Sequence, residues 1–254
     1  MQSVVLEVRN LTKRFGGLVA VSGLDFDVHE GEILGVIGPN GAGKSTTFNI
    51  IAGAYPASAG EVRFAGESIL GLPPHRIAAR GLMRTFQHNR PFAGMSVVDN
   101  ALVGAHTRFG LNVFGKKSSL EEKANRARAE ELIEFVGLAE FRNADVATLS
   151  FGQGRLLEIV RGLAGGPRLM LFDEPAAGLT PAELERVAGV IRGIAARGIA
   201  VLLIEHDMHF LLPLAHRVVV LNFGAKIADG LPDEIRAQPA VMDAYLGGGH
   251  AAAR

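Results

Sequence analysis

The sequence predicts an α/β fold, in which strands alternate with helices, and three observations lead to this prediction. An apolar run, Ile33–Ile37, is followed by a glycine-rich segment and then by a helical pattern from Thr46 to Ala54. A second apolar run, Leu169–Phe172, ends in two carboxylates. A helical pattern over 181–196 and another apolar stretch over 200–204 then continue the alternation, as is typical of α/β proteins.

The glycine-rich segment has the spacing of a phosphate-binding loop, G-x-x-x-x-G-K-S. Glycines allow successive backbone N–H groups to point at one anion, and the N-terminus of the following helix favours negative charge. Lys44 would reach the β- and γ-phosphates of a nucleotide, and the Ser45 hydroxyl would bind Mg²⁺. The residues expected around the phosphates are Gly38, Pro39, Asn40, Gly41, Ala42, Gly43, Lys44, Ser45 and Thr46.

The composition sets limits on the function of the whole chain. Its 254 residues carry 26 basic and 26 acidic side chains, so no basic excess points to nucleic acid. Cysteine is absent, which excludes disulfides, thiolate zinc sites and cysteine nucleophiles. No stretch reaches the roughly 20 apolar residues of a membrane span, and the N-terminus does not have the pattern of a signal peptide. We therefore expect a cytoplasmic protein that meets a membrane only through a partner.

The remaining elements are expected in this order along the chain. Proline opens a short helix near residue 74, which ends before Gly81, and glycine also ends a long helical pattern, Leu120–Val136. A loop rich in Gly, Asn, Lys and Ser precedes that long helix. Strands are expected at 4–8, 26–29, 33–37, 62–64, 83–86, 169–172, 200–204 and 218–221, and two short helices within 232–246.

The second apolar run places a pair of carboxylates where α/β folds bind ligands. Asp173 would stand at the C-terminal edge of the sheet and hold Mg²⁺ through water, and Glu174 would orient or deprotonate the attacking water. Apolar strands that end in Asp-Glu are common, and the phosphate-binding loop upstream is what favours the functional interpretation.

The segment Leu149-Ser150-Phe151-Gly152-Gln153 has two compatible interpretations. Ser150 and Gln153 form an S-x-x-Q capping box at the start of a helix. The segment also resembles the signature of ABC ATPases, Leu-Ser-Gly-Gly-Gln, in which Ser150, Gly152 and Gln153 match and Phe151 replaces the first glycine.

Further elements follow in the order of that family. Phe15 matches the aromatic that stacks on adenine, although a core aromatic is the alternative. Gln87 matches the glutamine that reaches the metal and the attacking water, and His206 matches the histidine that contacts the γ-phosphate; each would otherwise be ordinary polar surface. Thr180 stands where the family usually has aspartate, which leaves communication through this loop open.

The resemblance to ABC ATPases covers the chain from Leu6 to about Leu246, and it implies a specific organisation. A P-loop nucleotide-binding core, 1–86 and 156–230, would carry an N-terminal antiparallel β-subdomain. An inserted helical subdomain, 87–155, would follow, with C-terminal helices and a tail over 231–254. The whole chain would be a single ABC ATPase domain that binds ATP and Mg²⁺.

The resemblance also implies partners and a mechanism. Two subunits would face each other head to tail, with each ATP between one phosphate-binding loop and the other subunit's signature. Local strings, among them Arg84-Thr85-Phe86-Gln87 and Ala244-Tyr245-Leu246-Gly247, resemble LivG-type ATPases of bacterial branched-chain amino acid importers. The implied partners are a second ABC ATPase subunit, two membrane permeases at the cytoplasmic face of the inner membrane, and a periplasmic solute-binding protein. The surface after Gln87, with Phe92 and Met95, would receive a permease helix, or would be ordinary packing.

Three alternatives remain open at this stage. Urea and amide importers, and lipopolysaccharide exporters, use similar ATPases. An ABC ATPase that acts on DNA or ribosomes is disfavoured, because such proteins usually carry two ATPase units, a long coiled coil or a DNA-binding insertion. A simple kinase is disfavoured by the signature segment.

Overall fold

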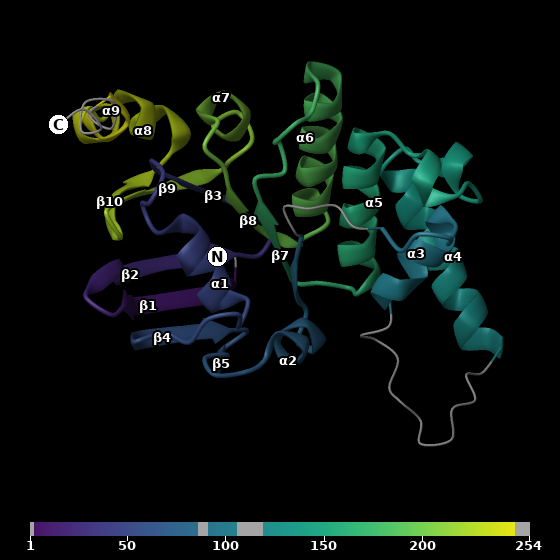
Figure 1. Cartoon of the computed structure of the whole chain (residues 1–254), viewed down its shortest axis with the longest axis horizontal. Coiled ribbons are helices and arrows are strands. Elements are labelled where there is room, and N and C mark those ends of the chain that lie inside the picture. Colours follow the sequence, from purple (N-terminus) through teal and green to yellow (C-terminus); the bar gives the residue numbers. More distant parts are fainter. Residues whose placement is uncertain (1–2, 86–90, 106–118, 247–254) are drawn as a thin grey trace.

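The computed structural model describes residues 3–85, 91–105 and 119–246, which form two sheets and surrounding helices (Figure 1). The first sheet has four strands in the order β2-β1-β4-β5, and all its pairings are antiparallel. The second has six strands in the order β10-β9-β3-β8-β7-β6, and it is parallel except for β10. The strands are β1 Val4–Phe15, β2 Leu18–His29, β3 Ile33–Ile37, β4 Ala59–Phe64, β5 Glu67–Ser68, β6 Leu82–Arg84, β7 Leu169–Asp173, β8 Ala200–Ile204, β9 Arg217–Asn222 and β10 Ala225–Gly230.

The helices cover the six-stranded sheet and extend to one side of it. Helices α3, α4 and α5 gather at the right of Figure 1, whereas α8 and α9 lie at the opposite end. The bounds are α1 Lys44–Ile51, α2 Pro74–Ala79, α3 Val97–Gly104, α4 Ser119–Phe135, α5 Phe151–Ala164, α6 Pro181–Ala196, α7 Met208–Leu211, α8 Pro232–Ala237 and α9 Pro239–Leu246, with short 3₁₀ turns η2 Ala139–Phe141 and η3 Val146–Thr148.

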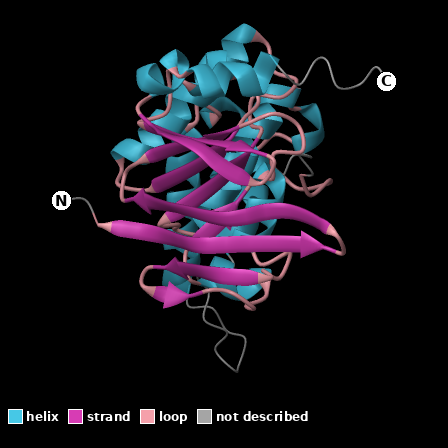
Figure 2. Cartoon of the chain, turned by 90° about the vertical axis from the view of Figure 1, so that its left-hand side faces the viewer, coloured by secondary structure: helices cyan, strands magenta, loops and turns pink. Residues whose placement is uncertain are grey.

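The parallel strands are apolar throughout because both of their faces are buried. On β7, Met170 and Phe172 point into the core shared with the helices, and Leu169 and Leu171 point into the core under the antiparallel sheet. Figure 2 shows the antiparallel strands in front of the helical layers. The six-stranded sheet is therefore the middle layer, and both of its faces are covered.

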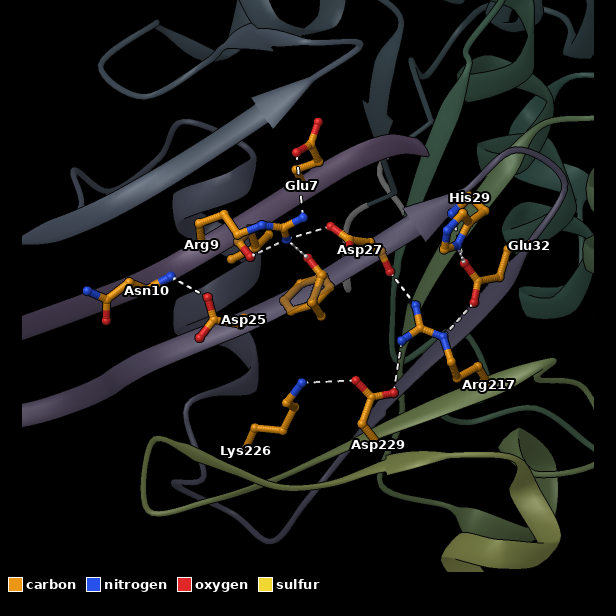
Figure 3. Close-up of polar contacts among 12 residues, drawn as sticks. Glu7, Arg9, Asn10, Asp25, Asp27, His29, Glu32, Arg217, Lys226 and Asp229 are labelled. Atoms are coloured by element: carbon orange, nitrogen blue, oxygen red, sulfur yellow. Dashed lines mark hydrogen bonds and ion pairs between the residues drawn. The ribbon is translucent and has the colours of Figure 1, made fainter. Parts of the chain in front are cut away.

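Charged side chains join the two sheets at one edge (Figure 3). Arg217 on β9 donates to the Glu32 carboxylate at 2.9 Å, to Asp229 on β10 at 2.8 Å, and to the backbone carbonyl of Asp27 on β2. His29 on β2 lies 2.9 Å from the other oxygen of Glu32. The buried Glu32 carboxylate has a lowered pKa, because the partners that stabilise its charge outweigh the opposing effect of burial.

Most of the expected elements are present, and the differences have local causes. Strands β3 and β8 and helix α6 have the predicted bounds. The predicted strands 4–8 and 26–29 were too short, because the pairing of β1 with β2 contains register shifts that break the two-residue periodicity. Asn10, with a φ of 47°, lies at one such irregularity.

Two helices, α3 and the single-turn α7, and two edge strands, β5 and β10, were not predicted. The helical subdomain was expected to end at residue 155, and this position lies within α5, which extends from Phe151 to Ala164. The division of the chain into subdomains remains a prediction. In the described residues, no helix combines the length and apolar character needed to cross a membrane.

Candidate functional site

The predicted phosphate-binding loop joins β3 to α1, as its sequence requires. Gly38 and Gly43 have φ angles of 154° and 98°. A side chain at either position would also collide with backbone, since an added Cβ would lie 2.2 Å from the Leu221 carbonyl oxygen or 2.4 Å from that of Ala20. At Gly41, by contrast, an added Cβ meets nothing within 4 Å, although its φ is 80°. The outer glycines therefore seat the loop against β2 and β9, whereas Gly41 supplies a turn on the open side.

Lys44 is buried at the start of α1, and its ammonium group binds the loop itself. The Nζ atom donates to the carbonyl of Gly38 at 2.6 Å and to that of Pro39 at 3.0 Å. Burial lowers the pKa of Lys44, and the nearby Asp173 and Glu174 act in the opposite direction. The cation expected to contact phosphates is therefore already in the loop, with both acidic residues in electrostatic range.

Asp173 ends β7, and its side chain is almost fully buried. Its Oδ2 atom accepts from Arg84 at 2.7 Å, and the other guanidinium arm donates to Asn49 on α1 at 2.7 Å. The Oδ1 atom of Asp173 is buried and has no hydrogen-bond partner among the described residues. An acceptor oxygen is therefore left over at the predicted magnesium position.

Glu174 and His206 meet at the ends of β7 and β8, as the parallel order of these strands predicts. The Glu174 carboxylate lies 3.7 Å from Nδ1 of His206. The neighbouring Glu205 is fully buried and accepts from the backbone N–H of Ala176 at 2.8 Å and from that of His206 at 3.3 Å. Burial raises the pKa of Glu205 to about 6.

Phe15 lies at the end of β1 with 44% of its surface exposed, which argues against a core aromatic. The ring of Tyr55 meets it edge-on, at 5.7 Å and 83°. The Lys13 ammonium lies 4.8 Å from the centre of the Phe15 ring and also donates to the Pro56 carbonyl at 2.7 Å. Phe15 is thus a supported, accessible aromatic of the kind that stacks on a base.

The signature-like segment begins α5, and the predicted capping box is confirmed. The Ser150 hydroxyl accepts from the Gln153 N–H at 3.2 Å, and the Gln153 side chain accepts from the Ser150 N–H at 2.8 Å. An added Cβ on Gly152 would lie 2.3 Å from the Glu183 carboxylate. Phe151, where the family pattern has glycine, is 54% exposed and tolerated at the first helical position.

The structure brings the nucleotide-side residues together but leaves the signature apart from them. Strands β3, β8 and β7 are neighbours, so the phosphate-binding loop, His206 and Asp173 share one edge. Helix α5 instead packs against α3, α4 and β6 (Figure 1). Gln87 and the loop 106–118 lie outside the described residues.

Two residues to which the sequence interpretation gave no role, Arg84 and Glu205, contact Asp173 and His206. Thr180, noted in the sequence only as a departure from the family pattern, has a structural role. Thr180 caps α6, accepting from the Glu183 N–H at 3.4 Å while its own N–H donates to Glu183 at 2.9 Å. The spacing T-x-x-E is a capping box that could have been recognised in the sequence. Arg84 carries no such local signal, because Asn49 and Asp173 are distant in the chain, and the contact of Glu205 with Ala176 is likewise long-range.

The site fits a magnesium ion that arrives with a nucleotide. In the part of the chain that the structure describes, no three His, Asp or Glu side chains cluster to hold a metal by themselves. Mg²⁺ is usually bound by one or two carboxylates together with phosphates and water, and therefore needs no such cluster. The unpartnered Oδ1 of Asp173 and the hydroxyl of Ser45 in the first turn of α1 are suitable donors.

This fold and this edge define a nucleotide-binding protein of the P-loop class. The chain belongs to the ABC transporter family, whose model matches residues 21–177. A second model, the branched-chain amino acid ATP-binding cassette transporter, matches residues 225–251. The protein is therefore a nucleotide-binding, ATP-hydrolysing subunit that acts with transporter partners.

Individual relatives cover nearly the whole chain. It is 43% identical to the high-affinity branched-chain amino acid transport ATP-binding protein BraF of Pseudomonas aeruginosa, over 97% of this chain and 99% of that relative. It is 38% identical to LivG of Escherichia coli, a protein of the same description, with the same coverage. The solved ADP conformation of MJ1267, an ATP-binding cassette of an ABC transporter, has a TM-score of 0.86 and 31% identity, covering 96% of this chain and 99% of that one.

Proposed function

We propose that this subunit hydrolyses MgATP to power the uptake of branched-chain amino acids through partner permeases. The cargo rests on one observation: the likeness to BraF and LivG extends over the full length and includes the C-terminal segment 225–251. No residue of an ATPase subunit needs to contact the transported solute, so the cargo is inferred from this relationship.

The geometry supports a division of roles at the sheet edge. Lys44 binds phosphate oxygens, and Ser45 and Asp173 hold Mg²⁺, which would neutralise charge on the transferring phosphoryl group. Glu174 orients or deprotonates the attacking water, and His206 contacts the γ-phosphate. Gln87, which lies outside the described residues, is proposed to reach the metal and the water.

A second subunit would complete the site. Within one chain, α5 packs against α3, α4 and β6, and the Glu183 carboxylate accepts from the Gly152 N–H and from Ser150 at the N-terminus of α5. A phosphate from another chain would take the place of this carboxylate beside Ser150, Gly152 and Gln153. A helix N-terminus favours an anion, and ATP would bridge two such chains. The partners proposed are a second ABC ATPase, two permeases and a periplasmic solute-binding protein, which places the subunit at the cytoplasmic face of the inner membrane.

The test is co-purification of the tagged protein with membranes from its own host, followed by mass spectrometry. We expect a sister ATPase, two permeases and a solute-binding protein whose ligand is leucine, isoleucine or valine. Recovery of a binding protein for urea or an amide would show that the cargo is not a branched-chain amino acid. Recovery of lipopolysaccharide-export components would show that the subunit powers export rather than uptake. Recovery of ribosomal or DNA-associated proteins without permeases would contradict the transport function.

ATP-dependent leucine uptake in vesicles reconstituted with the recovered complex provides a direct check. The Lys44→Ala variant serves as the control, because it should assemble normally and yet weaken nucleotide binding. Equal uptake with both proteins would contradict the proposed role of the phosphate-binding loop.

A further inference from the structure

Arg84 lies between the two elements that carry the proposed magnesium residues. It is the last residue of β6, and its side chain is only 17% exposed. One arm of its guanidinium binds Asp173 Oδ2 at 2.7 Å, and the other binds Asn49 Oδ1 on α1 at 2.7 Å. Arg84 therefore bridges the end of β7 and the helix that follows the phosphate-binding loop.

The contact with Asn49 extends this bridge toward Ser45. Residues four apart on a helix lie on the same face, so Asn49 and Ser45 share one side of α1. The guanidinium is planar and its donors have a fixed geometry. A rigid fork that holds both Asn49 and Asp173 consequently limits the separation of Ser45 from Asp173.

The unused atoms in this cluster point to a ligand. Asp173 Oδ1 and Arg84 Nε are both buried without a hydrogen-bond partner among the described residues. Buried polar atoms in native proteins are nearly always paired, and an exception calls for an explanation. Because Arg84 holds Oδ2, Oδ1 is kept in one orientation and is available as an acceptor.

We propose that Arg84 is a positioning residue for the magnesium site, which keeps the Asp173 carboxylate in one orientation and fixes its distance from Ser45 before the metal arrives. This inference rests on the proposed assignment of Ser45 and Asp173 to Mg²⁺. A merely structural link between β6 and α1 would affect folding and nucleotide binding alike. A positioning residue instead affects the metal selectively.

The experiment measures metal affinity separately from nucleotide affinity in the full chain. Mn²⁺ serves as the probe, because its binding to the protein–ATP complex can be followed by electron paramagnetic resonance. ATP affinity is measured in parallel with EDTA present. The variants are Arg84→Gln and Arg84→Lys, and the control is Arg63→Gln, which removes an exposed arginine paired with Glu61 on β4.

We expect Arg84→Gln to weaken Mn²⁺ binding by about tenfold, as changes to groups that orient metal ligands do. Metal-free ATP affinity should stay at the wild-type value, and the turnover number should recover at high Mg²⁺. Arg84→Lys should be intermediate, because it keeps the charge but loses the fork. Arg63→Gln should change neither affinity.

Two further variants keep the test decisive. Asn49→Ala removes only the hydrogen bond between Arg84 and α1, and it should also weaken Mn²⁺ binding. This variant keeps the test possible if Arg84→Gln folds poorly. Unchanged Mn²⁺ affinity in both Arg84→Gln and Asn49→Ala, or an equal loss of metal-free ATP binding, would overturn the role of Arg84. If Asp173→Asn also leaves Mn²⁺ affinity unchanged, the proposed magnesium assignment itself fails.

Discussion

Glu174 adopts a backbone conformation that is unfavourable for any residue except glycine. Its φ is 47°, in the left-handed region, and its N–H is held by the Ile204 carbonyl at 3.0 Å. This conformation costs about 1 kcal/mol for a residue with a side chain. Strain of this kind concentrates at functional sites, and here it accompanies the turn that places Glu174 beside His206.

The Glu174→Gln variant tests the role of this carboxylate. Glutamine keeps the size and the backbone requirement but cannot accept a proton from water, so turnover should fall at least about 100-fold. ATP affinity should be preserved, and a closed dimer should accumulate with ATP. Phosphate release and size-exclusion chromatography measure the two effects, with Glu185→Gln on α6 as the exposed control. Undiminished hydrolysis would contradict the water-activating role.

Glu205 should make stability depend on pH. Burial raises its pKa from 4.5 to about 6, so the folded protein holds this proton more tightly than the unfolded chain does. The folded state is consequently favoured below about pH 4.5 and loses this contribution as the pH rises through about 6.

The Glu205→Gln variant removes this titration but retains an acceptor for the Ala176 N–H. At pH 8 it should be more stable than the wild type by roughly 2 kcal/mol, from about 1.4 kcal/mol for each pKa unit. The difference should shrink toward zero as the pH approaches 4.5. Urea unfolding at both pH values measures it, with Glu140→Gln as control. A variant less stable than the wild type at pH 8 would show that the charge itself is required.

At the scale of elements, the phosphate-binding loop depends on its neighbours as much as on its own sequence. The Ala42 carbonyl accepts from the Gly224 N–H at 3.1 Å, and Ser22 on β2 donates to the Gly224 carbonyl at 2.8 Å. The loop, the β9–β10 turn and β2 are thereby joined. A motif that seems self-contained in sequence is held in place by two other segments, the β9–β10 turn and β2.

Alanine substitutions at Gly41 and Gly43 should separate the cost in stability of a positive φ from the cost of a steric collision. Gly41→Ala meets no atom and should cost about 1 kcal/mol through its positive φ. Gly43→Ala adds a collision with the Ala20 carbonyl and should cost clearly more, at least about 2 kcal/mol. Thermal unfolding without nucleotide compares them. Equal losses would show that β2 moves away freely.

At the scale of the whole molecule, the ion-pair cluster around Arg217 links the antiparallel sheet to the parallel one at one edge. Arg217 connects β9 to β2 and β10, and it neutralises the buried Glu32 (Figure 3). Phe15, at the end of β1, belongs to the antiparallel sheet, whereas Lys44 follows a strand of the parallel one. The position of the proposed adenine contact relative to the proposed phosphate contact therefore depends on how the two sheets are joined.

Arg217→Met should keep the packing of the stem and remove the charge. Leaving Glu32 buried without this partner should cost about 2 to 3 kcal/mol. Arg192→Met removes a solvent-exposed pair with Glu185 and should cost less than about 1 kcal/mol. Urea unfolding at neutral pH measures both losses. Similar values for the two variants would show that the junction is not stabilised by this cluster.

The sequence predicted those parts of the fold that depend on local pattern. The parallel strands were predicted because they are apolar on both faces, and α6 because proline marks its first turn. The strand predicted at 4–8 was shorter than β1, because register shifts break the periodicity of β1. Helix α3 was not predicted.

What the sequence by itself determined is the character of short segments: a loop with the spacing of phosphate-binding loops, a strand that ends in Asp173 and Glu174, and a capped helix at Ser150. Each depends on residues within a few positions of one another, where backbone geometry and spacing suffice. Only the tertiary structure decided that Arg84 holds Asp173 and that Glu205 accepts from the backbone of Ala176. These contacts join residues far apart in the chain, and long-range contacts arise from the packing of the strands rather than from any local pattern.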